Sequence, residues 1–546
     1  MATYVNDLRL KEIATGDEAG TWGTSTNTNL ELIAEAMGVG AEAVADASTH
    51  TITMADGATD QFRSTFLRLT GGGQACTVTL APNTLSHTWI MRNETAAALT
   101  LTQGSGANVT IAAGQTKIVA TDGGGSGAIV YQMDDLELAG NLAVGGELST
   151  PSAGTSNVRI GVNAGDSIAS GGNYNVVVGD EAGTAITTGD SNVFVGYQSG
   201  DATTTADSNV GIGRGTLTTN ILSDHNTAIG NGALFTHNQA SSTDSYNTAV
   251  GSNAGAAVTT GVQNTLIGGL AGDAITTANN NTALGYSALG LNTTGAGNTA
   301  IGRTALENNT TASDNVAVGR ATLSQNTTGA NNTAVGSLAL LVNTTASNNV
   351  AVGLSTLQAN TTGGQNVAVG ASSLYTNTTG ASNTAVGHQV LASNTTASNN
   401  TGIGFEALNA NTTGRDNTAL GFSAGVTNTT GLENTAIGMY ALRFNTTGDT
   451  NTAVGLQALH RNTTASSNTA VGRNAMEANT TGALNSALGS SALANNTTGG
   501  NNVAMGFATM QLNTTASNNV AIGYAAMNAN TTGASNVAVG RSALGA

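Results

Sequence analysis

A glycine that returns every seventeen residues constrains the fold of this chain more than any other feature. It closes each copy of a short motif such as Asn417-Thr418-Ala419-Leu420-Gly421. These register glycines are Gly161, Gly179, Gly196, Gly213, Gly230 and Gly251, followed by every seventeenth residue from Gly268 to Gly540. Twenty-three glycines follow the pattern, and all but two of the intervals are seventeen residues long. Repetition this regular predicts an architecture of stacked, equivalent units.

The pattern inside each repeat indicates β-structure. Residues before the register glycine alternate, and the last of them is nearly always Val, Ile or Leu. A small residue and then Leu or Met follow three and four residues after the glycine, as in Ala407-Leu408. Asn-Thr-Thr begins seven residues after it in fifteen consecutive repeats, from Asn292 to Asn530. One repeat therefore predicts a strand, a tight bend, a second strand and a polar turn.

Stacked coils of this kind predict a parallel β-solenoid or β-roll. A helix is excluded because Asn-Thr-Thr would interrupt it in every repeat. With coils roughly 4.8 Å apart, twenty-three of them would form a rod about 110 Å long. Each coil offers few apolar anchors, and the small residues near the register glycine leave room for close approach of another chain. We therefore expect a parallel homotrimer.

The repeat around Asn411 illustrates the structural roles that we expect. Leu408 and Leu420 are the predicted apolar anchors, Gly421 marks the register, and Asn411 begins the corner between coils. Asn-Thr-Thr is also the acceptor motif for N-glycosylation, and a threonine array can order water as ice-binding proteins do. We favour a structural role, in which Asn411 bonds nearby backbone and the asparagine of the next coil in an amide ladder.

Composition narrows the function classes. Aromatic residues make up 3% and charged residues 9% of 546 residues, with 73 glycines, which indicates many small buried surfaces instead of a few large cores. The net charge of −17 disfavours binding to nucleic acids and anionic membranes. No stretch of eighteen apolar residues occurs, and the first twenty residues lack the apolar core of a secretory signal. The single cysteine, Cys76, excludes an intrachain disulfide.

Catalytic and metal-binding constellations are scarce, so we expect neither an enzyme nor a cofactor. The histidines show no metal-ligand spacing; they are His50, His87, His225, His237, His388 and His460. A sugar-cleaving site would need two carboxylates in a cleft. The nominees are Asp180, Glu181, Glu406, Asp416 and Glu433. They fall at turns or strand edges and are interpreted as scattered solubilising charges.

The residues before the repeats divide into three segments. Residues 1–40 contain Gly20-Thr21-Trp22-Gly23, a predicted turn around a large side chain, followed by a short helix with Leu30, Ile33 and Met37 on one face. Residues 41–133 hold short alternating runs and predict a small antiparallel β-sandwich or jelly roll. Residues 134–157 predict a β neck that sets the chains in register, and residues 158–546 form the repeat shaft.

Residues 4–38, "YVNDLRLKEIATGDEAGTWGTSTNTNLELIAEAMG", resemble the virion-attachment end of bacteriophage tail fibres, particularly those of podophages. The resemblance implies that Trp22, Leu30, Ile33 and Met37 attach the chain to tail or connector proteins. It places the protein in the virion tail, assembled in the host cytoplasm. Residues 77–130 resemble a small β-domain common in such fibres, and "NTAVG" and "NVAIG" resemble the repeats of trimeric autotransporter adhesin heads, which are β-rolls.

Together these features predict a trimeric phage tail fibre that contacts a host surface glycan or protein receptor. A polysaccharide-degrading tail spike and a cell-surface trimeric adhesin are the alternatives. Some variable positions of the shaft hold aromatic residues, which could stack on sugars or pack between coils and chains. They are Tyr286, Phe405, Phe422, Tyr440, Phe444, Phe507 and Tyr524. The sequence stops partway through a repeat, which indicates either a truncated chain or a distal domain that has been lost, cleaved or left out.

Overall fold

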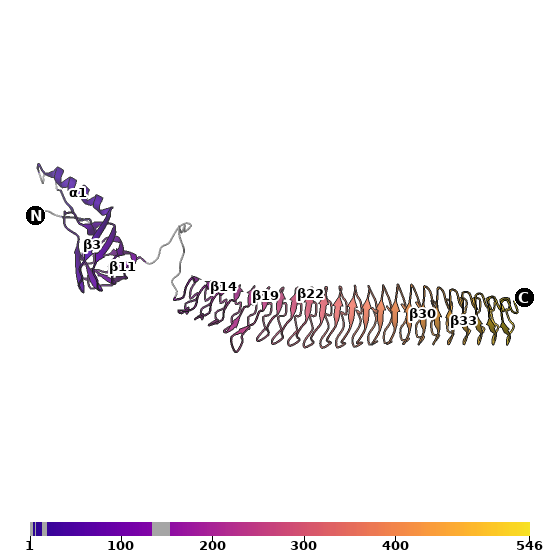
Figure 1. The fold of residues 1–546 in the computed structure, drawn as a ribbon. Coiled ribbons are helices and arrows are strands. Elements are labelled where there is room, and N and C mark those ends of the chain that lie inside the picture. The colour runs from indigo at the N-terminus through magenta and orange to yellow at the C-terminus, as the bar shows by residue number, and fades with distance from the viewer. Residues whose placement is uncertain (1–3, 6, 14–18, 134–152, 546) are drawn as a thin grey trace. The chain divides into compact units, whose positions relative to one another are not determined.

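The structure, a computed structural model, describes residues 4–5, 7–13, 19–133 and 153–545. The chain divides into two compact units, residues 1–146 and 147–546. In Figure 1 the first unit is coloured from indigo to purple and the second from magenta to yellow. Each unit has its own hydrophobic core. The neck expected at residues 134–157 lies outside the described residues except for its last five.

The first unit is a two-sheet β-sandwich with one helix, α1 (Trp22–Ala36). One sheet has the strand order β11 (Val130–Gln132), β10 (Thr116–Thr121), β7 (Thr88–Asn93), β5 (Phe66–Gly71) and β3 (Val39–Val44). The other has the order β4 (Thr49–Thr53), β6 (Cys76–Ala81), β8 (Leu99–Thr102) and β9 (Val109–Ile111). The short elements are the antiparallel pair β1 (Tyr4–Val5) and β2 (Leu10–Lys11), and the 3-10 turns η1 (Gln61–Arg63) and η2 (Gly125–Gly127).

Strand direction in this sandwich differs from the antiparallel arrangement that the sequence predicted. The pairs β3–β5, β5–β7, β4–β6 and β6–β8 are parallel. Only β7–β10, β10–β11 and β8–β9 are antiparallel. The chain crosses from one sheet to the other after β3, β5 and β7, and so it winds as coils before it closes with antiparallel strands. Alternating runs with short links suit a hairpin and a crossover equally well, and therefore do not specify direction.

Alternation of apolar and polar residues builds the core of the first unit. In β6 the side chains of Cys76, Val78 and Leu80 point inward, and the residues between them are only partly buried. Trp89 is fully buried, stacks on Phe62 with ring centroids 4.8 Å apart, and donates its indole N–H to the Phe62 carbonyl at 2.8 Å. These contacts join β7 to η1.

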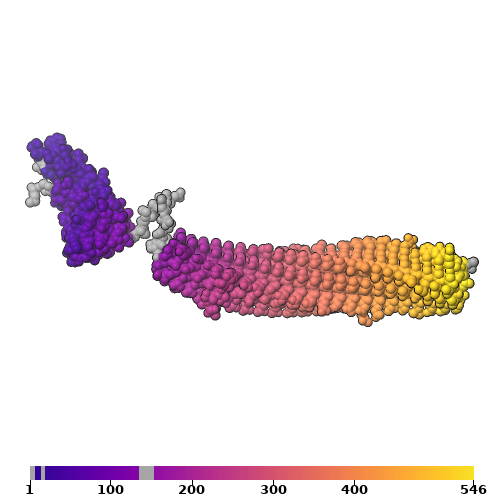
Figure 2. Space-filling model, viewed as in Figure 1, coloured from indigo at the N-terminus to yellow at the C-terminus, as the bar shows by residue number. Residues whose placement is uncertain are grey.

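The second unit, the shaft, confirms the predicted long parallel β-solenoid. Its main sheet has twenty-three parallel strands, from β12 (Val158–Ile160) to β36 (Val537–Val539), and each consists of the three residues before a register glycine. The strands lie side by side along one side of the shaft, and the coils form regular parallel rows in the space-filling view (Figures 1 and 2). In all but two of the neighbouring strand pairs each residue pairs with the residue seventeen positions on, as Thr401 of β28 (Thr401–Ile403) does with Thr418 of β29 (Thr418–Leu420).

Apart from the coil that also carries β16 (Ser223–Asp224), each seventeen-residue coil has one strand, and the second strand expected at Ala407-Leu408 is a turn. In the coil of residues 404–420, four residues have positive φ: Gly404 (125°), Glu406 (56°), Leu408 (50°) and Asp416 (61°). Their N–H groups still bond neighbouring coils; Leu408, for example, donates to the Ala424 carbonyl at 3.0 Å. The stacking hydrogen bonds thus continue around the coil outside the strand. Leucine rarely adopts a left-handed conformation, so sequence patterns do not predict this turn.

The register glycine is required for two reasons. Gly268 has φ of 134°, and a Cβ there would lie 2.5 Å from the carbonyl oxygen of Gly285 in the next coil. Its neighbour Gly269 has no such restriction, because the nearest atom to an added Cβ would be a Tyr286 ring carbon at 3.7 Å. A side chain at Gly268 would therefore separate two coils, whereas one at Gly269 would extend into free space.

We expect Gly268→Ala to loosen the stacking of coils 251–285 and Gly269→Ala to leave it intact. The backbone strain of the first substitution costs about 1–3 kcal/mol before the clash with Gly285 is counted. Hydrogen–deuterium exchange measured by mass spectrometry would report this as faster amide exchange in these coils only. Equal exchange in the two variants would show that the glycine is not needed at Gly268.

Candidate functional site

Asn411, the predicted corner residue, belongs to a buried amide ladder. Its Nδ2 donates to Oδ1 of Asn394 in the preceding coil at 3.0 Å and to the Gly414 carbonyl at 2.8 Å. Its own Oδ1 accepts from Nδ2 of Asn428 in the following coil at 2.9 Å. The side chain is fully buried. Asn411 therefore serves the stacking of coils, and no sugar or other ligand reaches its amide in the folded shaft.

A second amide ladder, which the sequence analysis did not identify, uses the asparagine four residues before each register glycine. The backbone N–H of Asn417 donates to Oδ1 of Asn400 at 3.0 Å, and its Nδ2 donates to the Gly431 carbonyl at 2.9 Å. Asn434 then donates its Nδ2 to Oδ1 of Asn417 at 3.2 Å. This asparagine occurs before all twenty-three register glycines, from Asn157 to Asn536. Its presence in every repeat is the sequence feature from which the second ladder could have been predicted.

The two predicted apolar anchors have different environments. Leu408 is 2% exposed and packs in the shaft core. Leu420 is 44% exposed in the single chain, so the prediction that it anchors the coil is wrong. The reason is the alternation of β29, in which Ala419 points inward and Leu420 outward. Gly421 lies at the register corner with φ of 140°.

The predicted attachment residues lie on an exposed apolar face of α1. Trp22 is 64% exposed, Leu30 59% and Met37 82%, while Ile33 is half-buried. The helix instead packs on its own unit through Leu32 and Ala36. It begins at Trp22, where the sequence had predicted a turn, and Met37 is its C-cap residue. An apolar helix face that its own unit leaves open is free to contact another protein.

A buried arginine holds α1 against the sandwich. Arg63 of η1 is fully buried and its Nη1 lies 3.0 Å from Oε2 of Glu35 on the helix. The guanidinium also donates to the carbonyls of Leu8, Ala55 and Ala58 at 2.7–3.1 Å. Because all three nitrogens of the guanidinium have partners, this charge is compensated despite its burial. The exposed face of α1 therefore has a fixed support.

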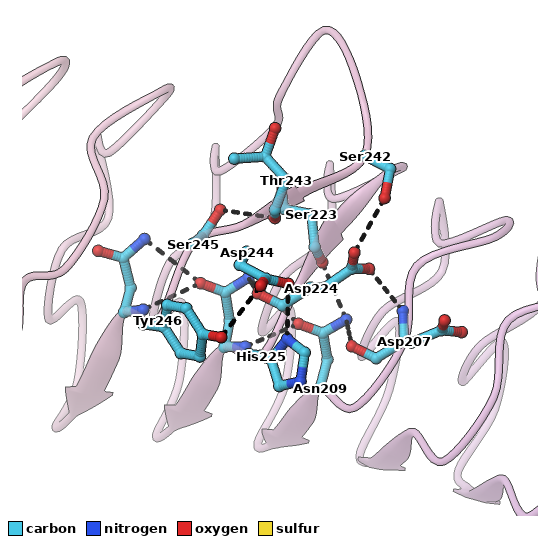
Figure 3. A network of polar contacts seen from close by, with 12 residues as sticks. Asp207, Asn209, Ser223, Asp224, His225, Ser242, Thr243, Asp244, Ser245 and Tyr246 are labelled. Carbon is cyan, nitrogen blue, oxygen red and sulfur yellow. Dashed lines mark hydrogen bonds and ion pairs between the residues drawn. The ribbon is translucent and has the colours of Figure 1, made fainter.

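The long coil between Gly230 and Gly251 contains an additional strand, β18 (Thr243–Asp244), which pairs in parallel with β16 (Ser223–Asp224) of the preceding coil. Figure 3 shows the polar network around them. Asp224 accepts from the Asp207 backbone N–H at 2.7 Å and from the Ser242 hydroxyl at 3.0 Å. Asp244 lies 3.0 Å from His225 Nδ1 and 3.0 Å from the Tyr246 hydroxyl. These contacts secure the extra loop to its neighbours.

Two of the five nominated carboxylates make local contacts between neighbouring coils. Glu181 accepts from Gln198 Nε2 at 2.7 Å, and Asp416 accepts from Asn399 Nδ2 at 3.0 Å. Among the residues that the structure describes, no group of three or more His, Cys, Asp or Glu side chains could hold a metal ion. Within the same residues, no helix combines the length and apolar character needed to cross a membrane.

The predicted aromatic residues occupy the exposed rows of the shaft, and neighbouring rings also contact each other. Tyr286 is 55% exposed, and Phe507 and Tyr524 are each 52% exposed. Phe405 stacks on Phe422 with centroids 5.1 Å apart, and Phe507 stacks on Tyr524 at 5.4 Å. Packing between coils, one of the two alternatives, therefore occurs while the outer ring edges stay in contact with solvent.

Comparison with known protein families, with curated proteins and with solved structures gave no match.

His237 occupies the position that holds the corner asparagine in later coils. It is fully buried, and neither ring nitrogen has a hydrogen-bond partner. Burial lowers the pKa of His237 from 6.5 to about 4. The imidazole is therefore neutral inside the shaft at neutral pH, and it lies in the long coil, with Asn220 and Val258 at the equivalent positions of the neighbouring coils.

We expect His237 to make coils 213–251 acid-sensitive. Between pH 6.5 and 4 the folded state binds fewer protons than the unfolded state. The contribution of neutral His237 to the stability of the folded coils is therefore complete above pH 6.5 and is lost as the pH falls toward 4. The loss amounts to about 3 kcal/mol. In hydrogen exchange, His237→Val should protect these coils increasingly better than the native chain as the pH is lowered, with coils 404–438 as internal control. A difference that stays constant with pH would contradict this.

Proposed function

We propose that the chain is a subunit of a bacteriophage tail fibre, a structural and adhesive protein of the virion tail. Its N-terminal unit would attach to tail or connector proteins, and its shaft would extend toward a glycan or protein receptor on the host surface. The resemblance of residues 4–38 to fibre attachment ends supports this function. A long solenoid and an exposed apolar helix face are the parts that such a fibre needs.

The observation that carries the proposal is the outer face of the main sheet. Each strand turns its middle residue inward and its flanking residues outward, so the residue before every register glycine lines this face. Val335 and Val352 are each 37% exposed there, and Leu420 is 44% exposed. A column of Val, Ile and Leu along so many coils is a larger apolar surface than soluble monomers usually present.

A second copy of the same chain is the partner that fits this face best. Its strands have the same spacing, so parallel copies align coil by coil and bury the column along its whole length. We propose three copies, the number found in the adhesin heads that the repeats resemble. The non-enzymatic shaft would then be a threefold rod with its variable rows facing outward.

Native mass spectrometry should give a species of three times the chain mass of 53.7 kDa. We expect the pair Val335→Asp and Val352→Asp to weaken this assembly, because it would bury unpaired carboxylates in the interface. The matched pair Thr328→Asp and Thr345→Asp, at exposed positions of the same coils, should leave the mass unchanged. A native chain that is monomeric would rule out the trimer.

In virions that carry the protein, we expect the pair Leu30→Ser and Met37→Ser to prevent incorporation of the fibre. The substitutions remove apolar surface that the first unit itself leaves exposed, so folding should be retained. Glu31→Ser, at an exposed polar position of α1, is the control. Immunoelectron microscopy should place residues 41–133 near the tail and the last coils farthest from it. The opposite order would overturn the proposed polarity.

A further inference from the structure

One patch of the shaft concentrates aromatic and cationic side chains that the fibre architecture does not require. In it, His388, Phe405 and Phe422 follow the register glycines of three successive coils. The rings stack nearly in parallel, at 5.5 Å between His388 and Phe405 and 5.1 Å between Phe405 and Phe422, with interplanar angles of 11° and 9°. Stacking covers the inner ring faces and leaves the edges exposed.

The stack changes geometry at Tyr440 and opens a hollow. Tyr440 meets Phe422 edge to face at 5.5 Å, and Phe444 meets His460 edge to face at 5.1 Å. The Arg443 guanidinium lies 4.5 Å from the Tyr440 ring centroid and 5.1 Å from that of Phe444. A surface hollow of about 500 Å³ lies beside these rings; it is lined by Thr427, Phe444, Thr446, His460, Arg461 and Thr463.

The hollow has positive charge in a chain whose net charge is −17. Its lining contains Arg461 and no carboxylate, and neither Arg443 nor Arg461 forms an ion pair within residues 153–545. Burial lowers the pKa of His460, and the charges of Arg443 and Arg461 lower this pKa further. The hydrogen bond with the Tyr440 carbonyl and the charge of Glu477 raise the same pKa by a smaller amount. A guanidinium with free N–H groups beside a hollow is suited to bind a carboxylate.

The threonines of the hollow present hydrogen-bond acceptors. Thr427 Oγ1 donates to the carbonyls of Arg443 and Asn445 at 2.7 and 3.0 Å. Thr446 and Thr463 each donate to a carbonyl of the next coil at 3.0 and 3.1 Å. Since each hydroxyl hydrogen is already used, the oxygen lone pairs remain to accept hydroxyl groups of a ligand.

We propose that this hollow binds a sugar acid, such as a uronic-acid residue of a polysaccharide. Arg461 would pair with the carboxylate, the threonines would accept sugar hydroxyls, and Phe444 would contact the apolar face of the sugar ring. Only two arginines are present, which is too few for a polynucleotide, whose binding depends on many phosphate contacts. The inference deepens the proposed function, because the polysaccharide would belong to the host surface.

Isothermal titration of the purified full-length protein with trigalacturonate tests the proposal, with maltotriose as the neutral comparison. We expect trigalacturonate to bind, more weakly at high salt, and maltotriose to bind at least about tenfold less well. Arg461→Gln should weaken trigalacturonate binding about tenfold or more, the effect of losing one charge-assisted hydrogen bond. Arg415→Gln, an exposed arginine outside the hollow that pairs with Asp416, should change it less than about twofold.

Any of the following results would overturn the proposal. Absence of trigalacturonate binding, or equal binding of maltotriose, would exclude a sugar-acid site. Equal loss of binding in both arginine variants would show nonspecific attraction. Binding of single-stranded DNA that is also lost in Arg461→Gln, or a changed native mass of this variant, would assign the patch to nucleic acid or to the chain interface. Hydrogen exchange of coils 421–472 checks that each variant folds. Because purified protein is used, a negative result leaves the fibre function open, and that function is tested separately on virions.

Discussion

The shaft depends on the stacking of equivalent residues in successive coils. Each strand residue lies beside its equivalent in the next coil, in most coils seventeen positions away, so a buried side chain must fit against the equivalent side chains about 4.8 Å above and below, which in most coils are of the same type. The asparagine amide meets this condition because it carries both donors and an acceptor. In a column of asparagines, each amide can therefore donate a hydrogen bond to one neighbour and accept one from the other. Buried charges would repel along such a column, which accounts for the 9% of charged residues in the chain. Asp190, Asp207 and Asp224 do stack, and each accepts a backbone N–H of the preceding coil.

The sequence was sufficient to predict the features that repeat and insufficient for those that depend on the backbone path. The period, the parallel solenoid, the burial of Leu408 and the hydrogen bonds of Asn411 all follow from spacing and residue chemistry. The direction in which Leu420 points depends on which face of β29 is turned inward, and the sequence offered Ala419 and Leu420 on opposite faces. The turn at Leu408 was missed because leucine seldom takes the left-handed conformation that it adopts there. In the first unit, alternation predicted the strands but not their parallel pairing, since both directions produce the same pattern.

Two of the candidate sites are apolar surfaces that the units do not bury in their own cores. Helix α1 uses Leu32 and Ala36 for its own packing and leaves Leu30 and Met37 exposed. The main sheet likewise uses its inward alanines for the core and presents Leu420 and its equivalents outside. The sequence identified the apolar residues of both surfaces, although helical and strand periodicity alone do not tell which of two apolar faces a unit buries. The hollow beside Phe444 depends on contacts between three coils, which no single repeat shows.

The long coil between Gly230 and Gly251 shows that the shaft accommodates a change in one coil without a change in the next, because β17 (Thr227–Ile229) and β19 (Thr248–Val250) still pair in register across it. Contacts reach only from each coil to its neighbours, so the number of coils is independent of the shape of any one of them. Gain or loss of one whole seventeen-residue repeat would preserve both the reading frame of the gene and the register of the remaining coils. The length of the shaft can thus change in unit steps, separately from the first unit and from the side chains in the variable rows.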